Sequence, residues 1–288
     1  MKAIYKKEFK SYFNSMMGYV FIAFVLLTVS IYFSAFNLGM GYPLMGTTLS
    51  SVVFLFLILV PVLTMRSLSE EQKNKTDQLL YTSPVSVGEI VFGKYLALVS
   101  VYAIPVLVIC LYPVIMDEYG TVDFGMAYLA IFGFFLLGCA YISVGLFISS
   151  ITESQIIAAV ISFGVLLFSY LVSGITGFFS DTAITSFVAF TVILIMFCLI
   201  YYLMAKNILA STAVFLVGEV ALVILYFVKK TWFEGAIAKV LKTFDLAAAS
   251  TNMIQNGILD VTDIIFYLSV IGLFLFFTVQ SIQKKRWS

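Results

Sequence analysis

The sequence contains 288 residues, of which 62% are hydrophobic and 11% are charged, with a mean hydropathy of +1.09 and a formal net charge of +1. Soluble domains are about half apolar, so this composition indicates an integral membrane protein, and the near-neutral charge gives no indication of nucleic-acid binding. Cys110, Cys139 and Cys198 lie inside apolar runs and the chain has no histidine, which argues against a metal, haem or Cys/His catalytic site.

The first predicted element is an amphipathic helix within residues 1–17. Its apolar side chains, from Ile4 and Tyr5 to Met16, recur at three- to four-residue spacing, whereas four lysines and Asn14 lie mainly on the other side. A basic amphipathic helix of this kind is suited to lying on the cytoplasmic leaflet. The apolar run after it is longer than a signal-peptide core and ends without an A-x-A-like site, so we expect it to be retained.

Eight apolar segments are long enough to cross a bilayer, since a helical span needs about 20 mostly apolar residues. The segments are continuously apolar instead of alternating, which favours helices over a barrel. A tight turn is expected at 204–207, because Lys206 and Asn207 are costly in mid-bilayer. The expected spans are residues 19–36, 50–65, 95–116, 126–148, 155–174, 186–205, 208–228 and 264–280.

The positions of the lysines and arginines set the predicted orientation. With the N-terminus in the cytoplasm, twelve of the 16 basic residues face inward and both termini are cytoplasmic. The four exceptions are Lys229, Lys230, Lys239 and Lys242, all in the long outer loop 229–263. The apolar residues of "WFEGAIAKVLKTF" in that loop predict a second surface helix.

A charged cytoplasmic segment, residues 66–94, interrupts the apolar pattern after the second span. Ser67 and Glu70 have the spacing of a capping box, which predicts a polar helix that Pro84 ends. Ser86 and Glu89 repeat the spacing and are expected to cap the third span. A defined helix that carries two leucines favours a docking element, and an ordinary solvated loop is the alternative.

No phosphate-binding loop, nucleophile elbow or HExxH pair occurs in the sequence, so any ATPase would be another chain. No matching halves with broken helices are evident, which argues against a secondary transporter. Glu219 lies about ten residues into a predicted span, where an ionised group is costly. A packing hydrogen bond and a role in substrate or proton passage are both open for it.

Three stretches resemble a known family. "EEQKNKTDQLLYTSPVSVGEIVFGKY" is similar to the cytoplasmic segment between spans two and three of ABC type-2 permeases. "GLFISSITESQIIAAVISFGVLL" is similar to their spans four and five. "NGILDVTDIIFYLSVIGLFLFFTVQSIQKKRW" resembles the last span and basic tail of the gliding-motility and copper-maturation branch. The resemblance covers most of the chain.

The resemblance implies that the segment after span two is a coupling helix, which docks into a separate cytoplasmic ATPase. Two departures from the family pattern bear on it: Lys75 replaces a usual glycine, and Gln78 replaces a usual acid, with Asp77 one place earlier. The docking residues carried over are Thr76, Asp77, Gln78, Leu79, Leu80 and Pro84, framed by Glu70, Glu71 and Lys94. Glu89, in the cap of span three, and the exposed Glu153 of "SSITESQ", where Thr152 and Gln155 could cap span five, complete the predicted ATPase-coupling residues.

The sequence therefore predicts an all-α polytopic transmembrane bundle of about eight spans, forming one domain over residues 1–288. The resemblance implies a permease with a six-span core, to which the hairpin around 186–228 would be an addition. The expected function is the membrane subunit of an ATP-driven exporter in a prokaryotic plasma membrane. ATP and magnesium would bind to two partner ATPases, with no cofactor or catalytic site in this chain, and a second permease copy or a related auxiliary membrane subunit would complete the complex. The alternatives are a self-contained channel or ion-coupled carrier that uses Glu219, and, more weakly, a membrane enzyme or scaffold. The substrate is left open between a lipid-like molecule, a peptide and a membrane component.

Overall fold

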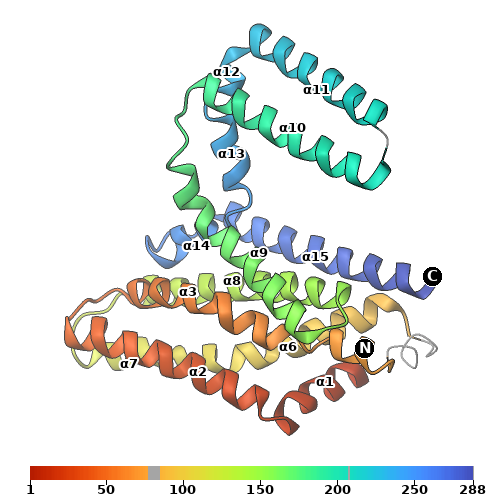
Figure 1. The fold of residues 1–288 in the computed structure, drawn as a ribbon. Helices are drawn as coiled ribbons and strands as arrows, with labels where there is room; N and C mark the ends of the chain where they lie inside the picture. The colour runs from red at the N-terminus through yellow and green to blue at the C-terminus, as the bar shows by residue number, and fades with distance from the viewer. Residues whose placement is uncertain (77–84, 207, 288) are drawn as a thin grey trace. The chain divides into compact units, whose positions relative to one another are not determined.

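The computed structural model of the chain describes residues 1–76, 85–206 and 208–287. All regular structure in these residues is helical, which confirms the predicted fold class (Figure 1). The helices are α1 (Lys2–Asn14), α2 (Met17–Tyr32), the π-helix η1 (Phe33–Gly39), α3 (Met45–Thr64), α4 (Ser69–Lys73), α6 (Val87–Ile109), α7 (Tyr112–Asp117), α8 (Phe124–Ile151), α9 (Gln155–Thr176), α10 (Ala183–Ala205), α11 (Ile208–Val228), α12 (Lys230–Phe233), α13 (Ala236–Lys242), α14 (Leu246–Ile254) and α15 (Val261–Trp287).

Seven helical stretches in the described residues are long and apolar enough to cross a membrane, against the eight expected. Each of the seven overlaps an expected span. The remaining one coincides with α10, whose apolar stretch Ala183–Leu199 falls short of 18 residues when only the described residues are counted. The predicted turn after α10 is present, because Lys206 adopts the left-handed conformation at φ 50° and ends the helix.

The contacts of the chain divide it into two compact units. Unit 1 comprises Met1–Tyr170 and Leu246–Ser288, and unit 2 comprises Leu171–Asp245. Unit 1 contains α2, α3, α6, α8, α15 and most of α9, which correspond to the predicted six-span core. Unit 2 contains α10 and α11, the two helices of the predicted extra hairpin.

Helix α8 forms the centre of unit 1 and packs against α3, α6, α14 and α15. In its apolar membrane-spanning stretch, 83% of the residues are buried. Gly145 permits a close approach of α3, because a Cβ atom at this position would lie 2.2 Å from Thr64 Oγ1. Small residues allow helix backbones to approach closely where the bilayer supplies no hydrophobic force between them. The close approach brings the end of α3 beside the end of α8, where the charged segment 66–94 begins.

The predicted amphipathic helix is α1, and its apolar side packs onto unit 1. Tyr12 is buried and its hydroxyl donates to the Leu63 carbonyl at 3.3 Å. The Tyr5 hydroxyl donates to Ser100 Oγ at 3.1 Å. The lysines of the helix are exposed on the other side, as the spacing predicts, so α1 is held by protein as well as being suited to a membrane surface.

The outer loop 229–263 differs from the prediction of one surface helix over residues 232–244. Gly235 has a φ of 65° and separates two short helices, α12 and α13, in unit 2. A positive φ costs glycine little and interrupts a helix. Phe233 and Ile237, expected on a membrane-facing side, are buried within unit 2.

Candidate coupling site

A buried lysine joins three elements of unit 1 at the end where segment 66–94 begins. Lys94, on α6, has a side chain only 1% exposed. Its ammonium nitrogen lies 2.9 Å from Glu8 Oε1 on α1, 3.0 Å from Glu71 Oε2 on α4, and 2.8 Å from the Ser67 carbonyl oxygen. A buried cation is tolerated when it is paired and hydrogen-bonded. Lys94 therefore fixes α1, α4 and α6 to one another.

Two further cations surround this buried group, which we call the Lys94 network. Lys7 lies 3.5 Å from Glu71 and 4.0 Å from Glu8, with 63% of its side chain exposed. Arg66 pairs with Glu70 across one turn. Three cationic and three acidic side chains thus balance in the network. Its exposed pairs are screened by water and contribute little, so the energetically important contacts are those of Lys94.

Tyr12 lies between the Lys94 network and helix α3. Its phenol is buried, and this burial raises its pKa above the usual value of about 10, with the nearby Glu8 acting in the same direction. The group is therefore neutral at physiological pH. It serves as a hydrogen-bond donor to α3 and adds no charge to the network.

A second set of contacts, which we call the Ser149 clamp, holds α4 from the side of α8 and α15. Ser149 Oγ, on α8, accepts the backbone N–H groups of Leu68 and Ser69, each at 3.1 Å. Gln72 donates to the Ser150 carbonyl at 2.8 Å. Lys285, near the end of α15, donates to Gln72 Oε1 and to the Ser150 carbonyl, both at 2.8 Å. A cation at the carbonyl end of α8 is also favoured by the helix dipole.

The two sets of contacts place both ends of the described chain at one end of unit 1. Glu8 pairs with Lys94, which also pairs with Glu71 of α4, and Lys285 donates to Gln72 of α4. Figure 1 shows α1 and the end of α15, marked N and C, on the same side of unit 1. This agrees with the predicted placement of both termini on one face of the membrane. That this face is the cytoplasmic one stays a prediction from the distribution of basic residues.

The predicted capping box at Ser67 and Glu70 is wrong. Helix α4 begins two residues later, at Ser69, and its start carries no local side-chain cap. The Ser67 hydroxyl is buried beside the Tyr12 phenol and does not cap the helix. Ser149 caps the helix in place of Ser67, because the free N–H groups at a helix start can donate to any nearby oxygen atom.

The second predicted capping box is confirmed. Ser86 Oγ accepts the Glu89 N–H at 3.3 Å, and the Glu89 carboxylate accepts the Ser86 N–H at 3.3 Å. Glu89 therefore fixes the start of α6, two turns before Lys94. In contrast, Glu153 is exposed, and it forms no ion pair with the described residues.

Lys75 explains one departure from the family pattern. Its φ is 55°, in the left-handed region that glycine adopts most easily. The turn therefore needs the conformation that a glycine would supply, and the lysine adopts it. Thr76 follows, with its N–H donating to the Glu71 carbonyl at 3.0 Å. The remaining predicted docking residues, Asp77, Gln78, Leu79, Leu80 and Pro84, lie outside the described residues.

Glu8, Ser149 and Lys285 belong to the site but were not predicted from the sequence. Glu8 had a recognisable signal: it follows Tyr5 by three residues and precedes Tyr12 by four, which places an acid on the apolar side of a basic helix. Such a residue needs a buried partner. Ser149 and Lys285 had no comparable signal, since serines are common in membrane helices and a basic tail is expected after an inward-facing span.

Glu219 lies on α11 in unit 2, and its carboxyl group contacts α10. Its Oε1 accepts the Thr191 hydroxyl at 3.2 Å, whereas its enclosed Oε2 has no hydrogen-bond partner among the described residues. The neighbouring Gly218 lies close to Leu194, so the two helices are tightly packed at this level. The structure thus shows a hydrogen bond between the helices of the hairpin.

We expect Glu219→Gln to leave the melting temperature and the transport rate unchanged at every pH tested. Glutamine has the same shape and keeps an oxygen that accepts the Thr191 hydroxyl. Thr191→Val removes that bond and serves as the contrast, with an expected loss of about 1 kcal/mol of unfolding free energy. A pH-dependent loss of transport in Glu219→Gln alone would instead make the carboxyl a proton carrier.

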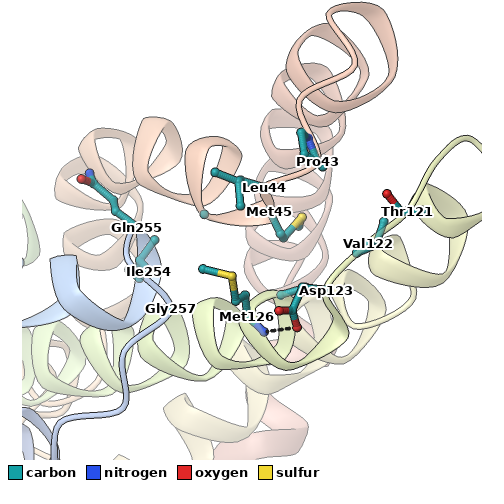
Figure 2. A pocket seen from close by; sticks show the side chains of 12 residues that line it. Pro43, Leu44, Met45, Thr121, Val122, Asp123, Met126, Ile254, Gln255 and Gly257 are labelled. Atoms are coloured by element: carbon teal, nitrogen blue, oxygen red, sulfur yellow. Dashed lines mark hydrogen bonds between the residues drawn. The ribbon is translucent and has the colours of Figure 1, made fainter.

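A hollow of about 360 Å³ lies at the opposite end of unit 1, beside the starts of α3 and α8 and the residues after α14 (Figure 2). Met45, Met126 and Ile254 line it. Its carboxylate, Asp123, accepts the Met126 N–H at 3.2 Å and so caps α8. The hollow therefore presents mainly apolar groups, and it contributes no residue to the coupling site.

Comparison with known proteins identifies the family. A comparison with curated proteins gave no significant match. The sequence does match a protein-family model described as "ABC-2 family transporter protein" over residues 2–285, which is nearly the whole chain. Together with the seven apolar helices found in the described residues, the match indicates a multi-pass membrane protein, which in bacteria resides in the cell membrane. The chain belongs to the ABC-2 family of transporter proteins, as a permease-type membrane subunit.

Proposed function

We propose that this chain is the membrane subunit of an ATP-driven exporter, powered by a separate cytoplasmic ATPase that docks on residues 76–84. Permeases of this family generally pair with ABC ATPases. Two ATPases, which bind ATP and magnesium, and a second permease copy or a related auxiliary subunit complete the proposed complex. The branch of the family and the substrate are not part of the proposal.

One observation carries the proposal: the helix that leads into the docking segment is fastened on two sides. The Lys94 network joins α4 to α1 and α6, and the Ser149 clamp joins it to α8 and α15. A solvated loop would need neither set of contacts. A segment that transmits force needs both, because motion passes only through contacts that persist while it moves.

The proposed mechanism is mechanical. ATP binding closes the ATPase pair, and the docking segment follows the ATPase to which it is bound. Because α4 is fixed to α1, α6, α8 and α15, displacement of the segment moves the ends of these helices. No covalent step occurs in this chain, and its residues contribute hydrogen bonds, charge pairing and packing.

The double variant Leu79→Asp, Leu80→Asp tests the docking surface. Burying a leucine contributes about 1.5 to 3 kcal/mol, so losing two is expected to weaken binding of the ATPase at least about a hundredfold. The measurement is co-purification with a candidate ABC ATPase, sought first among the neighbouring reading frames, together with ATP hydrolysis stimulated by the permease.

Ile258→Asp, Leu259→Asp is the matched control. It likewise replaces two adjacent apolar residues by aspartate, but in the predicted outer loop, where both side chains are exposed. It should leave both measurements unchanged. The proposal fails if the wild-type chain binds no such ATPase, or if the variant at positions 79 and 80 keeps both the complex and the stimulated hydrolysis.

A further inference from the structure

The junction between α1 and α2 opens a polar hollow at the end of unit 1 that carries the coupling site. Ser15 is extended, with φ −90° and ψ 147°, so the chain bends sharply between the two helices. The hollow has a volume of about 480 Å³. It is lined by Lys7, Lys10, Ser11, Asn14, Ser15 and Arg66. Three cations and three neutral hydrogen-bonding side chains therefore face one space, without a carboxylate in the lining.

An apolar hollow of about 440 Å³ adjoins the polar one, and Ser15 and Arg66 line both. It lies between α2 and α3, two predicted spans. Its other lining residues are methionine, valine, phenylalanine and leucine, among them Met17, Val20, Phe24, Leu59, Val62 and Leu63. A groove on two membrane spans thus begins where the cationic hollow ends.

The charge of the polar hollow is only partly balanced by protein. Arg66 pairs with Glu70, and Lys7 lies near Glu8 and Glu71. These three acids line a neighbouring hollow and not this one. Two of them, Glu8 and Glu71, also form ion pairs with Lys94. Lys10 is exposed and forms no ion pair with the described residues. An anion in the hollow would therefore meet a cation without a competing partner.

We propose that the joined hollows bind one anionic phospholipid, with its phosphate at Lys7, Lys10 and Arg66 and an acyl chain in the groove between α2 and α3. A free anion would leave the groove empty, and an uncharged lipid would leave Lys10 unpaired. Only a molecule with a negative head and an apolar tail matches the order of the two hollows along the predicted spans.

The position of this site gives it a link to coupling. Lys7 and Arg66 line the lipid hollow and also contact Glu71 and Glu70, which belong to α4. A phosphate drawn to these cations competes with the two carboxylates. Bound lipid is thus expected to weaken the Lys7–Glu71 and Arg66–Glu70 pairs, whereas the contacts of Lys94 continue to hold α1 and α4 together. The lipid site itself does not depend on the proposed ATPase partner, since it is complete within this chain.

The test measures lipid binding to the purified, delipidated full-length chain without any ATPase, by native mass spectrometry. Phosphatidylglycerol and phosphatidylcholine are titrated separately. We expect tighter binding of the anionic lipid, and a loss of about fivefold in affinity for Lys10→Gln, since one lysine near a membrane surface contributes about that factor. Lys6→Gln removes an equal charge from the same helix outside the hollow and should change the affinity little.

The apolar half is tested by Val20→Trp, which fills the groove, against Leu27→Trp, which adds the same group to an exposed position of α2 outside it. Only the first should weaken phosphatidylglycerol binding. Equal losses in Lys10→Gln and Lys6→Gln would mean diffuse surface attraction and overturn the proposal. Glycerol phosphate that displaces the lipid, combined with full binding by Val20→Trp, would mean a site for free anions and would also overturn it.

Discussion

Lys94→Met is expected to lower the free energy of unfolding by about 3 to 5 kcal/mol, the usual cost of breaking a buried ion pair by removing one partner. The variant leaves Glu8 and Glu71 close together without the cation that joins them, and it leaves the Ser67 carbonyl without its donor. Methionine fills a similar volume, so the loss reports charge and hydrogen bonding more than packing. Thermal unfolding in detergent, followed by circular dichroism, measures the effect.

A triple variant separates stability from coupling. Lys94→Met, Glu8→Gln, Glu71→Gln removes the cation and both carboxylates together, so no unpaired charge is buried, and most of the lost stability should return. The link between α1, α4 and α6 is still absent, so ATP hydrolysis stimulated by the permease should stay low. If the triple variant recovers stimulated hydrolysis along with its stability, Lys94 is only structural.

Ser149→Ala is expected to cost about 2 to 4 kcal/mol. One hydroxyl accepts two backbone N–H groups, those of Leu68 and Ser69, and donates to the Met65 carbonyl at 3.2 Å. A buried group left without a partner costs about 1 to 3 kcal/mol, and alanine leaves two N–H groups in that state. The start of α4 should loosen, and hydrogen exchange at residues 68 and 69 reports this directly.

Ser143→Ala is the matched control, because Ser143 is also a fully buried serine on α8. Its hydroxyl donates only to the Ala140 carbonyl, 2.7 Å away in the same helix. Alanine at that position leaves no N–H unpaired and should change stability by less than about 1 kcal/mol. Equal losses in the two variants would show that Ser149 acts through packing and not as a cap.

The spans were largely predictable because the bilayer acts on each helix separately. A span must be apolar along its whole length, so a segment such as Phe124–Ile151 can be recognised without knowing which helices pack against it. The same argument found the hairpin turn at Lys206, since a charge is costly in mid-bilayer. The hairpin of α10 and α11 was expected, but the separation of residues 171–245 as a compact unit could not be read from the sequence, because it depends on which helices pack together.

The candidate coupling site was predictable only where its signals are local. The capping box of Ser86 and Glu89 involves residues three apart, and it was found. The cap of α4 comes from Ser149, 80 positions from Ser69, and the local alternative at Ser67 was wrong. Lys94 was identified through the family resemblance, but its partner Glu8 is 86 positions away. Long-range polar contacts follow from helix packing, which the pattern of one helix does not encode.

Lys94 has a consequence for the kind of movement that this end of the protein can make. An ammonium group carries three N–H bonds, and three oxygen atoms already lie within 3.0 Å of it, those of Glu8, Glu71 and Ser67. A new acceptor can therefore be gained only by releasing an old one. Side-chain arrangements of this kind exchange between separate states instead of deforming gradually. We therefore expect α1 and α4 to change their relative position in a single step. Under the proposed mechanism, movements of residues 76–84 below a threshold would then leave α1 in place.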